Sequence, residues 1–139
     1  MRKYLLDTHI LIWYLNNDTR LSRNIADEIE CFRGNFFVSI ETLREIVMLK
    51  ELKKITLNLD TDGLIKKLNY YNMFILRIDE FHVKTLEKLS HPIINGKSHD
   101  DPFDRMLIAQ SIAERLTLIS ADTKFPFYPD KGFHLLQNE

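Results

Sequence analysis

The sequence predicts an α/β fold in which a parallel sheet lies between helices. Short apolar runs alternate along the chain with segments whose apolar residues recur with the period of a helix. The first four runs are almost continuously apolar, which is typical of strands covered on both faces, as in a parallel sheet. In chain order, the predicted strands are residues 3–6, 36–39, 73–78, 117–120 and a short terminal strand at 133–136.

Helical patterns fill the intervals between these strands. The segment at 22–32 opens on Ser22, a preferred N-cap residue, and carries Ile25 and Ile29 on one face. The segment at 102–116 is the strongest helix, and it opens with a proline, which suits a first helical turn. In chain order, the predicted helices are residues 10–16, 22–32, 40–52, 61–71, 80–89 and 102–116.

Length and composition exclude several classes of protein. The chain has 139 residues, and its 45% hydrophobic and 28% charged content is that of a globular protein, so we expect one domain over residues 1–139. The longest apolar run, residues 10–15, is far shorter than the roughly 20 residues that span a bilayer. The single cysteine, Cys31, fits a reducing cytoplasm. We therefore expect a cytoplasmic protein without membrane association, whose net charge of -1 neither favours nor excludes nucleic acid.

Four acidic residues lie at the ends of predicted strands or near the starts of predicted helices. Asp7 comes directly after the first strand and Asp122 just after the fourth, while Glu45 and Asp104 lie in the first two turns of helices. Ligands of open α/β sheets bind at the carboxyl ends of the strands. We therefore expect the four acids to converge on one rim of the sheet.

Such a cluster favours a hard divalent cation. Clustered carboxylates repel one another, and burying each one unpaired costs on the order of several kcal/mol. They persist if they are protonated, matched by cations or bound to a metal ion. Ligands that are all oxygen favour Mg²⁺ or Mn²⁺ over zinc. Such an ion activates water and stabilises charge on phosphorus during phosphodiester hydrolysis.

Each acid also has a simpler structural interpretation. Asp7 could cap the helix that follows it, and Asp122 could be an ordinary turn residue. Asp101 is better explained as the cap of the last helix, and for Asp104, at the third helical position, the two roles are compatible. Glu45 is the hardest to explain structurally, because it lies beside the apolar stripe of its helix.

Other chemistries have weaker support. The sequence contains no H-E-x-x-H, no G-x-x-x-x-G-K-[ST], no G-x-G-x-x-G and no G-x-S-x-G. His99 is interpreted as a solvated loop residue, and Cys31 as a core residue or a surface residue at a helix end. The stripe Trp13, Tyr14 and Leu15 indicates core packing or a groove for a partner.

Four motifs, in the order of the family, resemble the PIN-domain nucleases and in particular the VapC-type toxins of type II toxin–antitoxin systems. They are D-T-H at 7–9, V-S at 38–39 with E-I at 45–46, H-D-D-P-F-D-R-M-L-I-A-Q at 99–110, and S-A-D at 120–122 with Phe125 and Tyr128. The third is highly specific, whereas D-T-H alone is weak. One departure is Arg44, where the subfamily often has an aromatic residue.

The resemblance implies a three-layer α/β/α sandwich around a parallel sheet, usually in a homodimer. It also implies an endoribonuclease that depends on Mg²⁺ or Mn²⁺, acts on tRNA or other structured RNA, and is inhibited by a cognate antitoxin whose helix or tail covers the acids. By the same resemblance, Asp7, Glu45 and Asp104 are the core metal ligands. Asp122 completes the catalytic quartet, and the supporting hydroxyls are Thr8 and Ser120.

Basic residues near the acids are candidate contacts to the RNA backbone. We assign this role to Lys97, Arg105 and Lys124. The alternative is that these side chains are simply exposed to solvent and bind no ligand, as is usual for charged residues on helix faces. Contacts to phosphate would make RNA affinity fall steeply with salt.

Three rival functions share parts of this pattern. A catalytically silent module could use the same fold to hold RNA or a protein, but it would have no reason to keep four repelling acids. A phosphoacceptor receiver domain also places acids at strand ends, yet Asp79 is a poor acceptor and no acid pair adjoins Asp7. A nuclease for structured DNA would share the metal chemistry and differ in its substrate.

Overall fold

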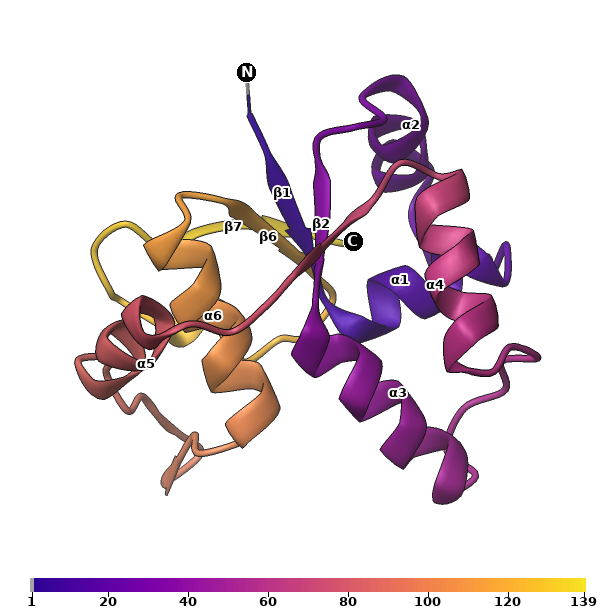
Figure 1. The fold of residues 1–139 in the computed structure, drawn as a ribbon. Helices are drawn as coiled ribbons and strands as arrows, with labels where there is room; N and C mark the ends of the chain where they lie inside the picture. Colours follow the sequence, from indigo (N-terminus) through magenta and orange to yellow (C-terminus); the bar gives the residue numbers. More distant parts are fainter. Residues whose placement is uncertain (1) are drawn as a thin grey trace.

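A five-stranded parallel sheet forms the centre of the protein (Figure 1). The structure, a computed structural model, describes residues 2–139. The strand order is β3-β2-β1-β6-β7, and every neighbouring pair in this sheet is parallel, as predicted. The strands are β1 (Tyr4–Leu6), β2 (Phe36–Ser39), β3 (Phe74–Leu76), β6 (Thr117–Ser120) and β7 (His134–Gln137).

Side chains of the central strands contribute to two separate hydrophobic cores, one on each face of the sheet. In β1 and β6, Leu6 and its partner Ile119 point to one face, while Leu5 and its partner Leu118 point to the other. All four side chains are fully buried. The continuous apolar runs of these two strands are therefore explained by helices on both sides of the sheet.

Helices cover both faces and complete the predicted three-layer α/β/α sandwich (Figure 1). Helices α1, α2 and α4 lie on one side, α5 and α6 on the other, and α3 extends from the end of β2. Among the described residues, no helix is long and apolar enough to cross a membrane. The helices are α1 (Thr8–Leu15), α2 (Arg23–Cys31), α3 (Ile40–Glu51), α4 (Thr61–Tyr70), α5 (Glu80–Glu87), α6 (Pro102–Ala113) and the 3₁₀ helix η1 (Phe125–Phe127).

Some details of these elements differ from the sequence-based prediction. The strand predicted at 73–78 is shorter and lies at the edge of the sheet, so Phe74 is 51% exposed and not covered on both faces. Helix α6 ends before residue 116, because Arg115 has a φ of 56° and cannot continue a right-handed helix. Cys31 is exposed at the end of α2, which confirms its surface interpretation.

A small hairpin precedes α6 and was not predicted. Strands β4 (Ile93–Ile94) and β5 (Lys97–Ser98) pair antiparallel, in a sheet of their own. Asn95 and Gly96, between them, both have positive φ, which matches the Asn-Gly signature of a tight two-residue hairpin turn. The hairpin ends at His99, whose backbone N–H donates to the Pro92 carbonyl at 2.9 Å. It therefore fixes the chain immediately before α6.

Candidate active site

The four predicted acids meet at one cavity beside the carboxyl ends of β1 and β6. The chain moves outward from β1 to β3 and then returns to place β6 on the other side of β1, so the strand order reverses between these two strands. Ligands of open α/β sheets bind at such a point. The cavity has a volume of about 350 Å³, and its lining residues are Asp7, His9, Trp13, Glu45, Asp101, Asp104, Ala121, Asp122 and Lys124.

Asp7 caps α1 and also faces the cavity. Its Oδ1 accepts a hydrogen bond from the Thr8 N–H at 2.7 Å, and its Oδ2 accepts one from Ser120 Oγ at 2.6 Å. The residue is only 8% exposed. The capping role and the site role are therefore compatible, because the same bonds fix the carboxylate at the end of β1.

Glu45 reaches the cavity from the second turn of α3. This helix starts directly after β2, where Ser39 Oγ accepts a hydrogen bond from the Glu41 N–H at 3.0 Å. Thr8 Oγ1 then donates to Glu45 Oε1 at 2.5 Å, and so links the end of β1 to α3. The Thr8 hydroxyl therefore fixes one oxygen of the Glu45 carboxylate relative to the end of β1.

Asp104 lies in the first turn of α6. Asp101 caps the helix as predicted, since its Oδ1 accepts a hydrogen bond from the Asp104 N–H at 3.0 Å. The Asp104 side chain is 16% exposed, and its Oδ2 lies 3.2 Å from His99 Nε2. The prediction that His99 is a solvated loop residue is wrong. His99 is buried because the hairpin turns it inward, where Tyr128 lies 2.7 Å from its Nδ1.

Asp122 is tied to Asp7 through one hydroxyl group. Ser120 Oγ donates to Asp7 and accepts a hydrogen bond from the Asp122 N–H at 2.9 Å. Asp122 Oδ1 accepts from the Lys124 N–H at 2.8 Å, and Lys124 Nζ lies 3.5 Å away. Within residues 2–139, Lys124 is the only lysine or arginine that lines the cavity. The negative charge of the acids is therefore incompletely balanced.

Burial and, to a smaller extent, neighbouring acids raise the pKa values of three acids of the cavity. Burial, followed by the charges of Asp101, Asp7, Asp122 and Glu45, raises the pKa of Asp104 to about 8. Burial is also the main reason why the pKa values of Asp7 and Glu45 are raised. A bound cation would favour the ionised forms of these groups.

Arg105 and Lys97 do not share the position of Lys124. The structure buries Arg105, whose Nη1 donates to the Ser90 carbonyl at 2.7 Å and to Tyr128 Oη at 3.1 Å. Its guanidinium therefore points into the protein and not toward a substrate, contrary to the sequence-based prediction. Lys97 is exposed on β5, in a neighbouring cavity that Lys124 also lines.

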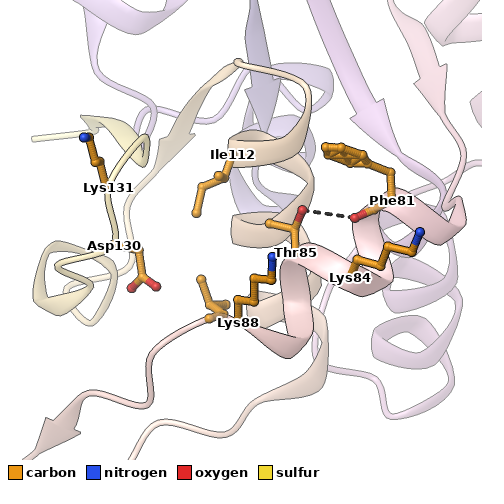
Figure 2. A pocket seen from close by; sticks show the side chains of 8 residues that line it. Phe81, Lys84, Thr85, Lys88, Ile112, Asp130 and Lys131 are labelled. Atoms are coloured by element: carbon orange, nitrogen blue, oxygen red, sulfur yellow. Dashed lines mark hydrogen bonds between the residues drawn. The ribbon is translucent and has the colours of Figure 1, made fainter.

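A second cavity, of about 410 Å³, lacks an acidic cluster (Figure 2). It lies beside α5, where the Thr85 hydroxyl donates to the Phe81 carbonyl at 3.0 Å. Asp130 is the only acid among its described lining residues, and this carboxylate accepts hydrogen bonds from the backbone and hydroxyl of Ser90. The acidic cavity is therefore the better candidate active site.

The comparison with known families agrees with this geometry. The family model of the PIN domain matches residues 4–131. The chain belongs to the PIN domain family. Among curated protein sequences, none matches it significantly.

Solved structures show that the PIN fold extends over nearly the whole chain. VapBC2 from Rickettsia felis, bound to a DNA fragment from its promoter, matches with a TM-score of 0.70, 17% identity and 98% coverage of both chains. DNA-bound VapBC from Salmonella typhimurium has a TM-score of 0.68, 17% identity and coverages of 99% and 98%. FitAB bound to an IR36 DNA fragment has a TM-score of 0.64, 18% identity and coverages of 96% and 94%.

The tight group of potential metal ligands in the described chain lies outside the cavity. It consists of Asp79, His82 and Glu114, whose donor atoms all lie within 4.8 Å of one another. There, His82 joins α5 to the end of α6: its Nδ1 accepts from the Asp79 N–H, and its Nε2 lies 2.8 Å from Glu114 Oε2. These contacts give the group a structural role between the two helices.

Two lining residues, His9 and Trp13, were missed as site residues. They lie four positions apart on α1, with ring centroids 6.0 Å apart. The signal was present in the sequence, because a helix that starts at Thr8 brings these positions onto one face. The prediction began this helix at residue 10 and so left His9 outside it.

Proposed function

We propose that this protein is a metal-dependent endoribonuclease that acts as the toxin of a toxin–antitoxin pair. One observation carries the proposal: Asp7, Glu45, Asp104 and Asp122 come from four separate parts of the chain and line one cavity where the strand order reverses. Membership of the PIN domain family and the fold shared with VapBC and FitAB support it.

Asp7, Glu45 and Asp104 would hold Mg²⁺ or Mn²⁺. When bound, such an ion supplies an activated water and stabilises charge on the RNA phosphate. Thr8 and Ser120 orient the carboxylates of Glu45 and Asp7 by donating hydrogen bonds to them. Asp122 faces the same space and would position the attacking water or a second ion. Attack by water in line with the bond leaves a 5′-phosphate and a 3′-hydroxyl.

Incubation of the purified protein, free of antitoxin, with total tRNA tests this proposal. We expect cleavage with Mg²⁺ or Mn²⁺ and none with EDTA. Asp104→Asn protein, purified in the same way, is the control for contaminating ribonuclease. Cleavage of structured DNA but not of RNA would overturn the choice of substrate. Metal binding without cleavage of either nucleic acid would favour a silent binding module.

An antitoxin is the proposed protein partner. A cavity of about 640 Å³ is lined by residues of α1, α2 and the loop between them and by Tyr71, and Trp13 lines both this cavity and the acidic one. A helix or tail seated in the larger cavity would therefore reach the acids past Trp13. Light scattering of the toxin alone and with its antitoxin tests this pairing and the expected homodimer. The cytoplasmic location and the single nuclease domain belong to the same proposal.

Lys97 and Lys124 are the proposed contacts to the RNA backbone. Replacing either lysine by Ala is expected to make the plot of log affinity against log salt less steep, by about one in the magnitude of its negative slope. The reason is that each phosphate contact releases about one counterion. Binding is measured in the Asp104→Asn background, so that the RNA stays intact. Lys131→Ala, in the cavity beside α5, is the matched control. An unchanged slope in both variants contradicts the assignment.

A further inference from the structure

We infer that Arg105, Tyr128 and His99 form a relay of hydrogen bonds that positions the carboxylate of Asp104 for metal binding. The inference rests on the proposed function and adds positioning residues to it. It also gives a role to two side chains for which the sequence suggested other roles: a solvated loop residue for His99 and an RNA contact for Arg105.

The donors and acceptors of this relay run in one direction. A guanidinium can only donate, so Tyr128 Oη accepts the hydrogen bond from Arg105 Nη1 at 3.1 Å. Of the two groups that contact the Tyr128 hydroxyl, only His99 Nδ1, 2.7 Å away, can accept its hydrogen, and we infer that the buried hydroxyl donates there. A neutral imidazole that accepts at Nδ1 carries its proton on Nε2. We therefore assign the Nε2–H tautomer to His99, which donates to Asp104 Oδ2 over 3.2 Å.

The surrounding structure holds each member of the relay in place. Arg105, Tyr128 and His99 are 7%, 5% and 7% exposed. Arg105 also donates to the carbonyls of Ser90 and Leu89, in the segment after α5. The rings of His99 and Tyr128 meet edge to face, with centroids 5.5 Å apart. The segment after α5, helix α6 and Tyr128 at the end of η1 therefore fix the direction in which His99 Nε2 points.

The hydrogen-bond partners of Arg105 explain why the relay suits a metal site. A buried arginine usually pairs with a carboxylate, and a direct pair with the adjacent Asp104 would neutralise the charge that attracts a cation. Here Arg105 contacts the carbonyls of Ser90 and Leu89, the phenol of Tyr128 and the imidazole of His91, the last at 3.3 Å. The group that reaches Asp104 is the uncharged imidazole of His99. It orients Oδ2 of Asp104 without placing a positive charge beside the site, and so does not compete with a metal cation for the carboxylate.

Tyr128→Phe is the most direct test, because it removes one hydroxyl and keeps the ring. Imidazole nitrogen NMR of the metal-free wild type is expected to show His99 as the Nε2–H tautomer, and Tyr128→Phe to shift it toward a mixture. Mn²⁺ affinity, measured by calorimetry, should fall about 10- to 100-fold, as for other partners of metal ligands. Tyr70→Phe, on the surface, is the matched control.

Substitutions of His99 separate positioning from packing. His99→Gln keeps an N–H donor at similar reach and should recover most of the Mn²⁺ affinity, whereas His99→Leu should not. Circular dichroism confirms the fold of each variant. A wild-type Nδ1–H tautomer would overturn the inference, as would unchanged Mn²⁺ affinity in folded Tyr128→Phe, even if the wild type cleaves RNA. If the wild type shows the Nε2–H tautomer and Tyr128→Phe loses Mn²⁺ affinity, but the wild type cleaves no RNA, the relay is supported and the proposed function is contradicted.

Discussion

Asp104→Asn is expected to lower the rate of RNA cleavage about a thousandfold while leaving the fold intact. Asp104 lies with the other acids around the cavity, and a catalytic metal ion contributes several kcal/mol of transition-state stabilisation. At about 1.4 kcal/mol per factor of ten, losing most of that contribution gives about three orders of magnitude. Asparagine keeps the size of the side chain and the backbone N–H that donates to Asp101.

Asp100→Asn is the matched control for this substitution. It changes the net charge equally, but its exposed carboxylate accepts from Ser98 Oγ at 2.9 Å and lies 3.0 Å from His91 Nδ1. Initial rates at saturating Mg²⁺, with unfolding curves for both variants, measure the two effects. Wild-type cleavage by folded Asp104→Asn would place the active site elsewhere, and an equal loss in Asp100→Asn would indicate a general effect of charge.

The positions of the acids could be predicted because each is fixed by local sequence. Asp7 follows a short apolar run that forms a buried strand, and Asp122 follows another. Parallel strands bring their carboxyl ends to one edge, so the convergence of these acids required only the correct fold class. To predict the position of Glu45, it was enough to locate the start of α3, where Ser39 is the N-cap.

The residues around the acids could not be predicted in the same way, because their burial depends on distant segments. His99 and Arg105 look like solvated loop and helix residues until Tyr128, more than twenty positions later in the chain, packs against them. The edge position of β3 likewise depends on strand order, which the apolar pattern does not specify. The Asn95-Gly96 turn was a readable local signal that went unused.

The metal-free protein is expected to lose stability as the pH rises from 6 to 8. The pKa of Asp104, about 8 in the folded state, lies above its ordinary value of 3.8. Between these values the folded state holds a proton that the unfolded state has released, so raising the pH favours unfolding. One such group changes the free energy of unfolding by about 1.4 kcal/mol per pH unit. Thermal unfolding in EDTA across this range measures the slope.

Mg²⁺ at saturating concentration should cancel this trend, because it binds the ionised carboxylates and Asp104 is then ionised in both the folded and the unfolded state. Below pH 8 its affinity should rise about tenfold per pH unit as Asp104 loses its proton, so the stabilisation by Mg²⁺ should grow with pH. Burial lowers the pKa of His99, which opposes the slope in EDTA near pH 6. Both proteins contain His99, so subtracting the free energy of unfolding of Asp104→Asn from that of the wild type at each pH removes most of the His99 contribution. If the two proteins show parallel profiles in EDTA, Asp104 is already ionised at pH 6. Burial and the neighbouring acids then raise its pKa less than stated above.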